Sequence, residues 1–390
     1  MENPEEIWLL ERSRLLEQAR TIVFKVGSAV LTNAQGLNST VIAHLAEQMA
    51  TIWRSRPDRR LVLVTSAAVA AGRSVLRKLG LDAEKSGLSA RQAIAAIGQC
   101  QLMQAWDEAF AVHGIATAQV LLTREDLRAR QHFLNVRNTF AELMDWGILP
   151  IVNENDTVSV QELKFGDNDN LSSLLANLVQ ADLVVNLTQA PGVRASDPQK
   201  DPTAPVLEHI DNIAQLDISK ICGSKSNVGT GGMYSKLKAA RRTAQLGVPT
   251  LILPGREPEI LTRAFVQNSR LGTYIKANQD VVSRRKYWLA YQTDPAGTLF
   301  IDRGAAEALL NSGRSLLPGG ICRVEGSFQE GALVAIKNDN EEIGVGLSNY
   351  SSQLIGRIMG LKRHEVAAIL GDAHYPDVIH RDNLLLHAVV

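Results

Sequence analysis

Short apolar segments rich in β-branched residues alternate with helical segments from residue 21 to residue 253 of this 390-residue chain. The expected strands are residues 21–26, 61–65, 116–120, 148–152, 183–187 and 249–253. The expected helices are residues 39–53, 66–78, 89–112, 169–180 and 233–246. Strands that alternate with helices form parallel βαβ units. We therefore predict an α/β fold with an open, mainly parallel sheet sandwiched by helices.

The pattern changes near Tyr287, because the later segments are short, strand-like and separated by glycines. The expected strands there are residues 298–301, 322–324, 333–336 and 343–347. They predict a second, small β-rich domain. Three parts are expected from the sequence. They are an N-terminal helical appendage at residues 1–20, a large α/β domain at residues 21–280, and a β-rich domain that follows a polar linker at residues 278–295.

Composition excludes several classes of protein. The 41 Lys and Arg residues balance 41 Asp and Glu residues, so no net charge indicates nucleic acid or a membrane surface. Cys100, Cys222 and Cys322 are widely spaced, which predicts free thiols rather than disulfides or a zinc site. The N-terminus lacks the features of a signal peptide, and no apolar run approaches the ~20 residues of a membrane helix. We expect a soluble cytoplasmic protein.

Lys25 lies within the first apolar strand, although a lysine buried without an anionic partner is costly. Ligands of open parallel sheets collect at the C-terminal ends of strands, and Lys25 is close to that end. One interpretation is a functional lysine facing an anion. The alternative is an edge-strand lysine that reaches solvent.

A glycine-rich segment, residues 229–236, opens a predicted helix. Glycines let backbone N–H groups approach phosphate oxygens, and a helix N-terminus favours negative charge. The segment is neither a Walker A loop nor a dinucleotide-binding GxGxxG motif. It therefore indicates either a different phosphate site or a plain flexible linker.

Two polar clusters follow one predicted strand, at residues 153–156 and 166–170. Short amides and carboxylates at a strand end and a helix start can bind an ammonium group, a carboxylate or Mg²⁺. The helix is expected to begin at about Leu171. Capping of that helix is the preferred interpretation of Asn170.

Together these motifs resemble the glutamate 5-kinases of the amino acid kinase family. The motifs are Lys25-Val26-Gly27-Ser28, Val64-Thr65-Ser66, Asn153-Glu154-Asn155-Asp156, Gly166-Asp167-Asn168-Asp169-Asn170 and Gly229-Thr230-Gly231-Gly232-Met233. The resemblance covers nearly the whole chain after Arg20, and this combination differs from acetylglutamate kinases and aspartokinases. It implies the amino acid kinase fold followed by a PUA domain, a small β-rich barrel, at residues 294–382.

The resemblance implies ATP-dependent phosphorylation of the side-chain carboxylate of L-glutamate to L-glutamyl 5-phosphate, the first step of proline biosynthesis. The implied catalytic residues are Lys25 and Lys236, which contact the ATP phosphates, and Asp169, which positions both lysines. The implied glutamate-binding residues are Ser66, Asn153, Asp156, Asp167 and Asn168. The further nucleotide-binding residues are Thr188, Gln189, Thr230, Gly231, Gly232, Met233, Tyr234 and Ser235.

The same resemblance implies Mg²⁺ as a cofactor, without an assigned protein ligand. It also implies a homo-oligomer, feedback inhibition by proline, and a product that passes to a reductase, glutamate-5-semialdehyde dehydrogenase. The carboxylate of glutamate, with a pKa of about 4.3, is already anionic at neutral pH and needs no general base. The site must instead neutralise charge and align the reactants.

The sequence departs from the family pattern at two positions. Ala67 stands where the family usually has glycine, and Gln189 stands where it usually has aspartate. We expect Ala67 to begin a helix with a negative φ, so that its methyl group costs little. The second departure bears on nucleotide affinity or base preference.

Two other functions are considered. One is a related kinase that acts on a different carboxylate or on a carbamate. The other is a PUA-containing RNA-binding protein with a degenerate kinase fold. The balanced charge and the lack of a basic stripe interleaved with aromatics argue against RNA binding.

Overall fold

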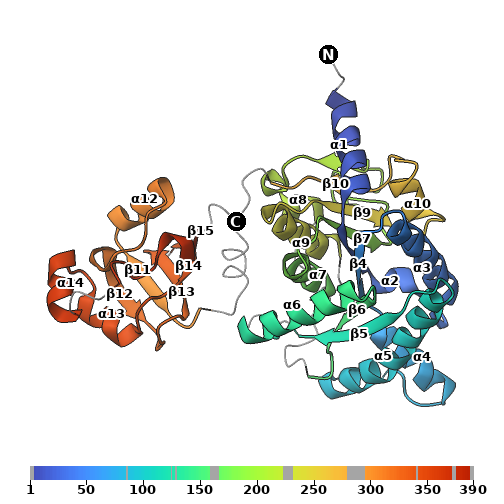
Figure 1. The fold of residues 1–390 in the computed structure, drawn as a ribbon, viewed down its shortest axis with the longest axis horizontal. Coiled ribbons are helices and arrows are strands. Elements are labelled where there is room, and N and C mark those ends of the chain that lie inside the picture. The colour runs from blue at the N-terminus through green and yellow to red at the C-terminus, as the bar shows by residue number, and fades with distance from the viewer. Residues whose placement is uncertain are drawn as a thin grey trace. The chain divides into compact units, whose positions relative to one another are not determined.

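The computed structural model of the chain forms two compact units, residues 1–281 and 282–390 (Figure 1). It describes residues 4–84, 87–123, 125–127, 130–158, 167–222, 232–278, 295–339, 341–370 and 375–386. Most of the expected linker at 278–295 lies outside these residues. In the described residues, no helix is long and apolar enough to cross a membrane.

The first unit is built on an eight-stranded sheet in the order β5-β6-β4-β1-β7-β9-β10-β8. The strands are β1 (Thr21–Val26), β4 (Arg60–Thr65), β5 (Thr117–Leu122), β6 (Leu149–Glu154), β7 (Leu183–Thr188), β8 (His209–Ile210), β9 (Thr250–Pro254) and β10 (Thr273–Ile275). All neighbouring strands are parallel except β9 and β10. The predicted mainly parallel sheet is confirmed, and β1 lies near its centre.

Helices pack on the sheet of the first unit (Figure 1). They are α1 (Pro4–Gln18), α2 (Ser28–Leu31), α3 (Ser39–Arg54), α4 (Ala68–Lys78), α5 (Leu88–Ala111), α6 (Arg130–Asp145), α7 (Asp167–Leu178), α8 (Ile218–Cys222), α9 (Met233–Gln245) and α10 (Ile260–Phe265). A short hairpin, β2 (Thr32–Asn33) and β3 (Gly36–Leu37), precedes α3.

Side chains of β1 alternate between the two faces of the sheet. Ile22, Phe24 and Val26 enter a core to which α3, α5 and α10 contribute. Lys25 therefore projects to the opposite face, where α7 packs on β1 and α9 packs on α7. This alternation places one charged side chain of a buried strand beneath the N-termini of two helices.

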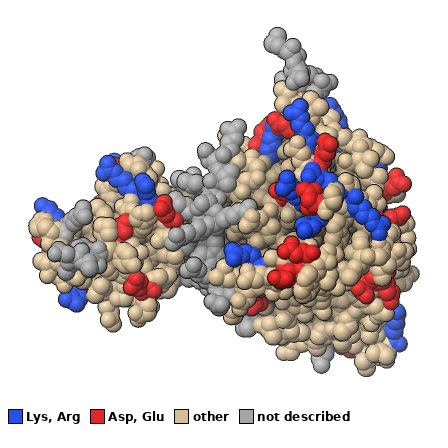
Figure 2. Space-filling model, in the orientation of Figure 1, with Lys and Arg blue, Asp and Glu red and all other residues tan. Residues whose placement is uncertain are grey.

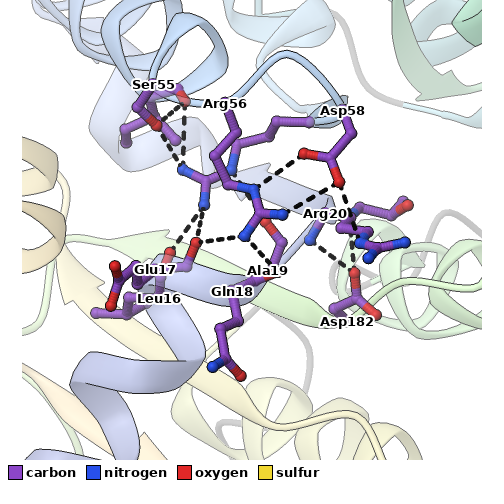
Figure 3. Close-up of polar contacts among 12 residues, drawn as sticks. Leu16, Glu17, Gln18, Ala19, Arg20, Ser55, Arg56, Asp58 and Asp182 are labelled. Atoms are coloured by element: carbon purple, nitrogen blue, oxygen red, sulfur yellow. Dashed lines mark hydrogen bonds and ion pairs between the residues drawn. The ribbon is translucent and has the colours of Figure 1, made fainter.

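Helix α1 contributes more than a surface appendage, because Trp8 and Leu16 are buried in the main core. Arg59, only 3% exposed, donates five hydrogen bonds, three of them to backbone carbonyls of Leu16, Glu17 and Ala19 at the end of α1. Arg56 also donates to the carbonyl oxygen of Glu17 (Figure 3). These two arginines satisfy carbonyls that a helix C-terminus otherwise leaves unpaired.

This region lies at the N-terminal ends of the strands. Asp182, just before β7, accepts hydrogen bonds from the backbone N–H groups of Arg20 and Thr21 (Figure 3). A shallow cavity of about 420 Å³ opens there. The charges on its walls are already engaged, since Arg56 pairs with Asp58 and the Asp182 carboxylate is hydrogen-bonded.

We expect Arg59→Met to lower the free energy of unfolding by about 2–4 kcal/mol, because several buried carbonyls lose their donor. Chemical denaturation of the full chain measures this value.

Arg12→Met is the matched control. Arg12 is 1% exposed, but its Nε and Nη2 atoms have no hydrogen-bond partner among the described residues. Burial lowers the pKa of Arg12 to about 10 despite the nearby Tyr274 and Glu208. We expect Arg12→Met to cost less than about 1 kcal/mol or to stabilise the protein. Equal destabilisation by both substitutions would contradict the importance given to the hydrogen bonds of Arg59.

The second unit has its own sheet, in the order β12-β11-β13-β14-β15. Its elements are β11 (Thr298–Ile301), α12 (Arg303–Ser312), β12 (Ile321–Glu325), β13 (Leu333–Asn338), β14 (Glu341–Leu347), α13 (Ser352–Ile358), α14 (Arg363–Leu370) and β15 (Leu384–Leu386). Leu299, Val334 and Ile355 belong to its separate core. The four expected strands are present, whereas α12, α13, α14 and β15 were not expected.

Candidate active site

Lys25, Asp169, Asn186 and Lys236 are buried and, with the half-buried Ser235, form a group called here the lysine–aspartate cluster. Lys25 is 4% exposed and lies on β1, between β4 and β7. The edge-strand interpretation of Lys25 is therefore wrong. Its Nζ atom lies 2.5 Å from Oδ1 of Asp169, which supplies the anionic partner that a buried lysine needs.

Asp169 lies in the first turn of α7 and is fully buried. Its Oδ2 atom accepts hydrogen bonds from Ser235 Oγ at 2.6 Å and Lys236 Nζ at 3.2 Å. Asn186 of β7 donates from Nδ2 to Oδ1 at 3.3 Å. Burial alone would raise the pKa of Asp169, but the charges of Lys25 and Lys236 lower that pKa to about 2. The carboxylate is ionised at neutral pH.

Lys236 approaches Asp169 from the first turn of α9 and is 4% exposed. Burial, and next the charge of Lys25, lower the pKa of Lys236 to about 8, while Asp169 opposes this shift. With both lysines protonated, two ammonium groups surround one carboxylate. The cluster then carries a net positive charge in a desolvated place, which suits an anion.

The glycine-rich segment is only partly described. Thr230 and Gly231 lie outside the described residues. Gly232 is the N-cap residue of α9 and makes no side-chain cap, and Met233 and Tyr234 are half-buried. Helix α9 thus begins beside the lysine–aspartate cluster, and the N-terminus of a helix favours negative charge.

Thr65, Ser66, Gln99, Asn153 and Asn168 form a second group, called here the amide cluster. Asn168 Nδ2 lies within hydrogen-bond distance of three acceptors, at 3.1 Å from Thr65 O, 2.9 Å from Ser66 Oγ and 3.0 Å from Asn153 Oδ1. Asn153 Nδ2 donates to Gln99 Oε1 at 2.8 Å. The structure thus brings together Ser66, Asn153 and Asn168, which the sequence predicted for one site.

Other predicted residues lie at the same edge of the sheet. Asp156 is half-buried in the turn after β6, and Asp167 is the first residue of α7, although its side chain is not described. Thr188 is buried at the end of β7, and Gln189 follows it as an exposed residue. Because β7 pairs with β1, Thr188 and Gln189 lie one strand away from the strand of Lys25.

The preferred interpretation of Asn170 as a helix cap is wrong. Helix α7 begins at Asp167, so Asn170 lies within its first turn. Its Oδ1 atom accepts a hydrogen bond from Arg242 Nη1 of α9. Asp and Asn favour helix caps because their side chains can hydrogen-bond to nearby backbone groups. Here the side chains of Asn168, Asp169 and Asn170 bond to other elements instead, so these three residues lie within the helix.

The expected negative φ of Ala67 is also wrong. Ala67, the N-cap residue of α4, has φ +93° and ψ 7°, in the left-handed region. The chain passes from β4 to α4 through Ser66 and Ala67, and Ala67 is 7% exposed. Such a conformation costs a residue with a Cβ atom about 1–2 kcal/mol.

We expect Ala67→Gly to raise the free energy of unfolding by about 1 kcal/mol, since glycine adopts this conformation without a Cβ penalty. Ala68→Gly is the control, because Ala68 is the first helical residue of α4 and glycine there costs about 1 kcal/mol. Denaturant titrations should move in opposite directions. Destabilisation by Ala67→Gly would mean that φ at this position is not a source of strain.

Asn186 and Gln99 were not predicted from the sequence. Asn186 could have been found by the same signal as Lys25, since it is also a polar residue inside an apolar strand. Gln99 lies on the long helix α5 among other polar residues and carries no such signal. Its hydrogen bond with Asn153 depends on where α5 lies relative to the end of β6 in the fold.

Comparisons with known proteins cover both units. Residues 20–254 match the amino acid kinase family and residues 297–370 match the PUA domain. Glutamate 5-kinase of Nitratidesulfovibrio vulgaris is 59% identical over 384 residues, which is 98% of this chain and 100% of that protein. Those of Oleidesulfovibrio alaskensis and Pelobacter propionicus are 53% and 44% identical, over 98% and 96% of this chain and 100% of each protein.

Proposed function

This chain belongs to the amino acid kinase family and, within it, to the glutamate 5-kinases, and we propose that it phosphorylates the side-chain carboxylate of L-glutamate. ATP is the phosphoryl donor, L-glutamyl 5-phosphate is the product, and the reaction is the first step of proline biosynthesis. The observation that carries the proposal is the lysine–aspartate cluster beside the amide cluster at one edge of the sheet. The first suits phosphate oxygens, and the second suits an amino acid.

Lys25 and Lys236 neutralise the negative charge that gathers on the transferring phosphoryl group. Asp169 contacts both ammonium groups and so sets the distance between them. The side-chain carboxylate of glutamate is a nucleophile without prior deprotonation, so catalysis needs alignment and charge neutralisation. The buried lysines and the N-terminus of α9 supply the charge neutralisation.

Glutamate is held by Ser66, Asn153, Asp156, Asp167 and Asn168. Asn168 Oδ1 is buried and has no partner among the described residues, so it can accept a hydrogen bond from the ammonium group of an amino acid. ATP contacts Lys25 and Lys236, the segment Thr230, Gly231, Gly232, Met233, Tyr234 and Ser235, and the end of β7 at Thr188 and Gln189.

Mg²⁺ is proposed to accompany ATP, but no protein cage for it exists in the described part of the chain. No group of three or more His, Cys, Asp or Glu side chains there could hold a metal ion. Asp169 is already paired with both lysines. Mg²⁺ commonly binds substrate phosphates and keeps several waters, and we assign no step to it.

The pKa of Lys236 predicts an alkaline limit on activity. We expect kcat/KM for ATP to fall above pH about 8, because Lys236 of the free enzyme loses its positive charge there. The fall in kcat should come at higher pH, since bound phosphates favour the ammonium form. Steady-state rates from pH 6 to 10 measure both profiles.

Lys236→Arg is the informative variant for this profile, because a guanidinium group loses its proton at a much higher pH than an ammonium group in the same place. Whatever the magnitude of its kcat/KM for ATP, this variant should not show the fall in kcat/KM near pH 8. A wild-type profile that stays flat to pH 10, or an unchanged limb in Lys236→Arg, would contradict the assignment of this limb to Lys236.

A coupled assay of ADP formation tests the proposed function. We expect turnover that depends on glutamate and is far weaker with aspartate, N-acetylglutamate or UMP. Preference for one of these acceptors would favour the related kinase, and no turnover with any acceptor would favour the non-catalytic alternative.

On the face shown in Figure 2, basic and acidic side chains of the first unit are interspersed, which gives no support to RNA binding by this unit.

Membership of the family also supports further proposals about partners. Proline is proposed as a feedback inhibitor, and the chain is proposed to form a homo-oligomer. The product is proposed to pass to glutamate-5-semialdehyde dehydrogenase. The cytoplasm is the proposed location, in agreement with three free cysteines.

A further inference from the structure

Gln99 stands at one end of the hydrogen-bonded series in the amide cluster. It lies on α5 and touches the cluster through one hydrogen bond, from Asn153 Nδ2 to Gln99 Oε1 at 2.8 Å. Asn153, 2% exposed at the end of β6, then accepts from Asn168. Three amide side chains from three different elements are therefore linked in series.

The orientation of every amide side chain in this series is fixed by which groups can donate a hydrogen bond and which can only accept one. A backbone carbonyl such as Thr65 O can only accept, so the NH₂ group of Asn168 must face it. The same NH₂ group faces Asn153, so Asn153 must turn its oxygen toward Asn168 and its own NH₂ group away. Gln99 must then present its oxygen to Asn153. No member can reverse without placing two donors or two acceptors together.

This order also fixes which atom of Asn168 remains for a ligand. Its NH₂ group is used by protein acceptors, so Oδ1 is the atom left, and Oδ1 is buried without a described partner. A buried acceptor of this kind favours a donor such as an ammonium group and disfavours a carboxylate. Reversal of Asn168 would invert that preference.

Stability does not explain an amide at position 99. Gln99 Nε2 is buried and has no hydrogen-bond partner among the described residues. A buried donor without a partner destabilises a fold, and an apolar side chain of similar length avoids that cost. The contact of the Gln99 oxygen with Asn153 is the feature that an apolar side chain cannot reproduce.

We propose that Gln99 is a positioning residue for the amino-acid substrate, which acts through Asn153 to hold Asn168 with Oδ1 toward the substrate ammonium group. The inference rests on the proposed function, because it assumes that Asn168 binds glutamate. Gln99 itself is not proposed to touch the substrate.

The test compares Gln99→Met with Gln104→Met in the full-length protein. Gln104 lies on the same helix and also hydrogen-bonds through its side chain, but its partner is Glu108 on the exposed surface. We expect Gln99→Met to raise KM for glutamate about threefold to tenfold, the effect of losing one neutral hydrogen bond. KM for ATP and the melting temperature should change little, and Gln104→Met should leave all three unchanged.

Two further variants separate positioning from a general structural effect. Gln99→Glu keeps an acceptor for Asn153, so KM for glutamate should return to within about threefold of the natural value. In an Asn153→Ala background, Gln99→Met should add less than about twofold, because the residue through which it acts is gone.

Each outcome has a distinct meaning. An unchanged KM for glutamate in Gln99→Met, or an equal rise for ATP, overturns the positioning role. Gln99→Glu as impaired as Gln99→Met overturns the claim that the oxygen carries it, and a full effect in the Asn153→Ala background overturns the route through Asn153. Absence of glutamate-dependent ADP formation in the natural protein is a failure of the proposed function instead.

Discussion

Replacing Lys25 or Lys236 with alanine is expected to lower kcat by at least about a hundredfold, with a much smaller change in KM for glutamate. Each ammonium group lies buried against Asp169, at 2.5 and 3.2 Å, where water cannot substitute for it. Their charges matter most when negative charge crowds the transferring phosphoryl group. Initial rates at saturating ATP and glutamate measure the effect.

Lys220→Ala provides the control for these two substitutions. Lys220 lies on α8 and its side chain is exposed, so its removal should leave kcat within about twofold. Circular dichroism and a thermal melt establish that each variant is folded, which matters because loss of one lysine leaves Asp169 less compensated. Near-normal turnover of a folded Lys25→Ala or Lys236→Ala variant would remove that lysine from the mechanism.

Gly98→Ala is expected to lower the free energy of unfolding by about 3 kcal/mol or more and to remove activity with it. A Cβ atom on Gly98 would lie 1.8 Å from Ala68 O and 2.3 Å from Gly72 N. Both are backbone atoms of α4, so no side-chain rotation relieves the overlap. Helix α4 would have to move, and Ala67 and Ser66 precede it directly.

Gly356→Ala is the matched control for Gly98→Ala. Gly356 also lies inside a helix, α13, but is exposed, and an added Cβ meets nothing within 4 Å. Alanine in an open helical position stabilises by up to about 1 kcal/mol. Denaturation curves of both variants therefore isolate the steric overlap from helix propensity. A Gly98→Ala protein as stable as the natural one would show that α4 and α5 separate at little cost.

The sequence predicted the sheet of the first unit because its strands are apolar runs separated by helical periodicity, a local signal. Lys25 stood out for the same local reason. The conformation of Ala67 could not be read in this way, because alanine gives no local signal for a positive φ, and the close packing of α4 on α5 at Gly72 and Gly98 joins residues far apart in the local pattern.

The amide cluster shows the other limit of sequence reasoning. Ser66, Asn153 and Asn168 were assigned to one site by family motifs, but no local pattern relates them. Asn168 and Thr65 are 103 residues apart in sequence, and Asn153 and Gln99 are 54 apart. Such contacts depend on which strands are neighbours in the sheet, and β6 pairs with β4 although β5 separates them along the chain.

The unequal charge of the lysine–aspartate cluster has a practical consequence for the choice of buffer. Two lysines face one carboxylate in a buried place, so small tetrahedral anions should occupy it when nucleotide is absent. Phosphate and sulfate in the medium will then protect the protein against heat, since they bind the native state and not the unfolded chain. The same ions will compete with ATP and raise its apparent KM. Kinetic constants obtained in phosphate and in a zwitterionic organic buffer will therefore differ.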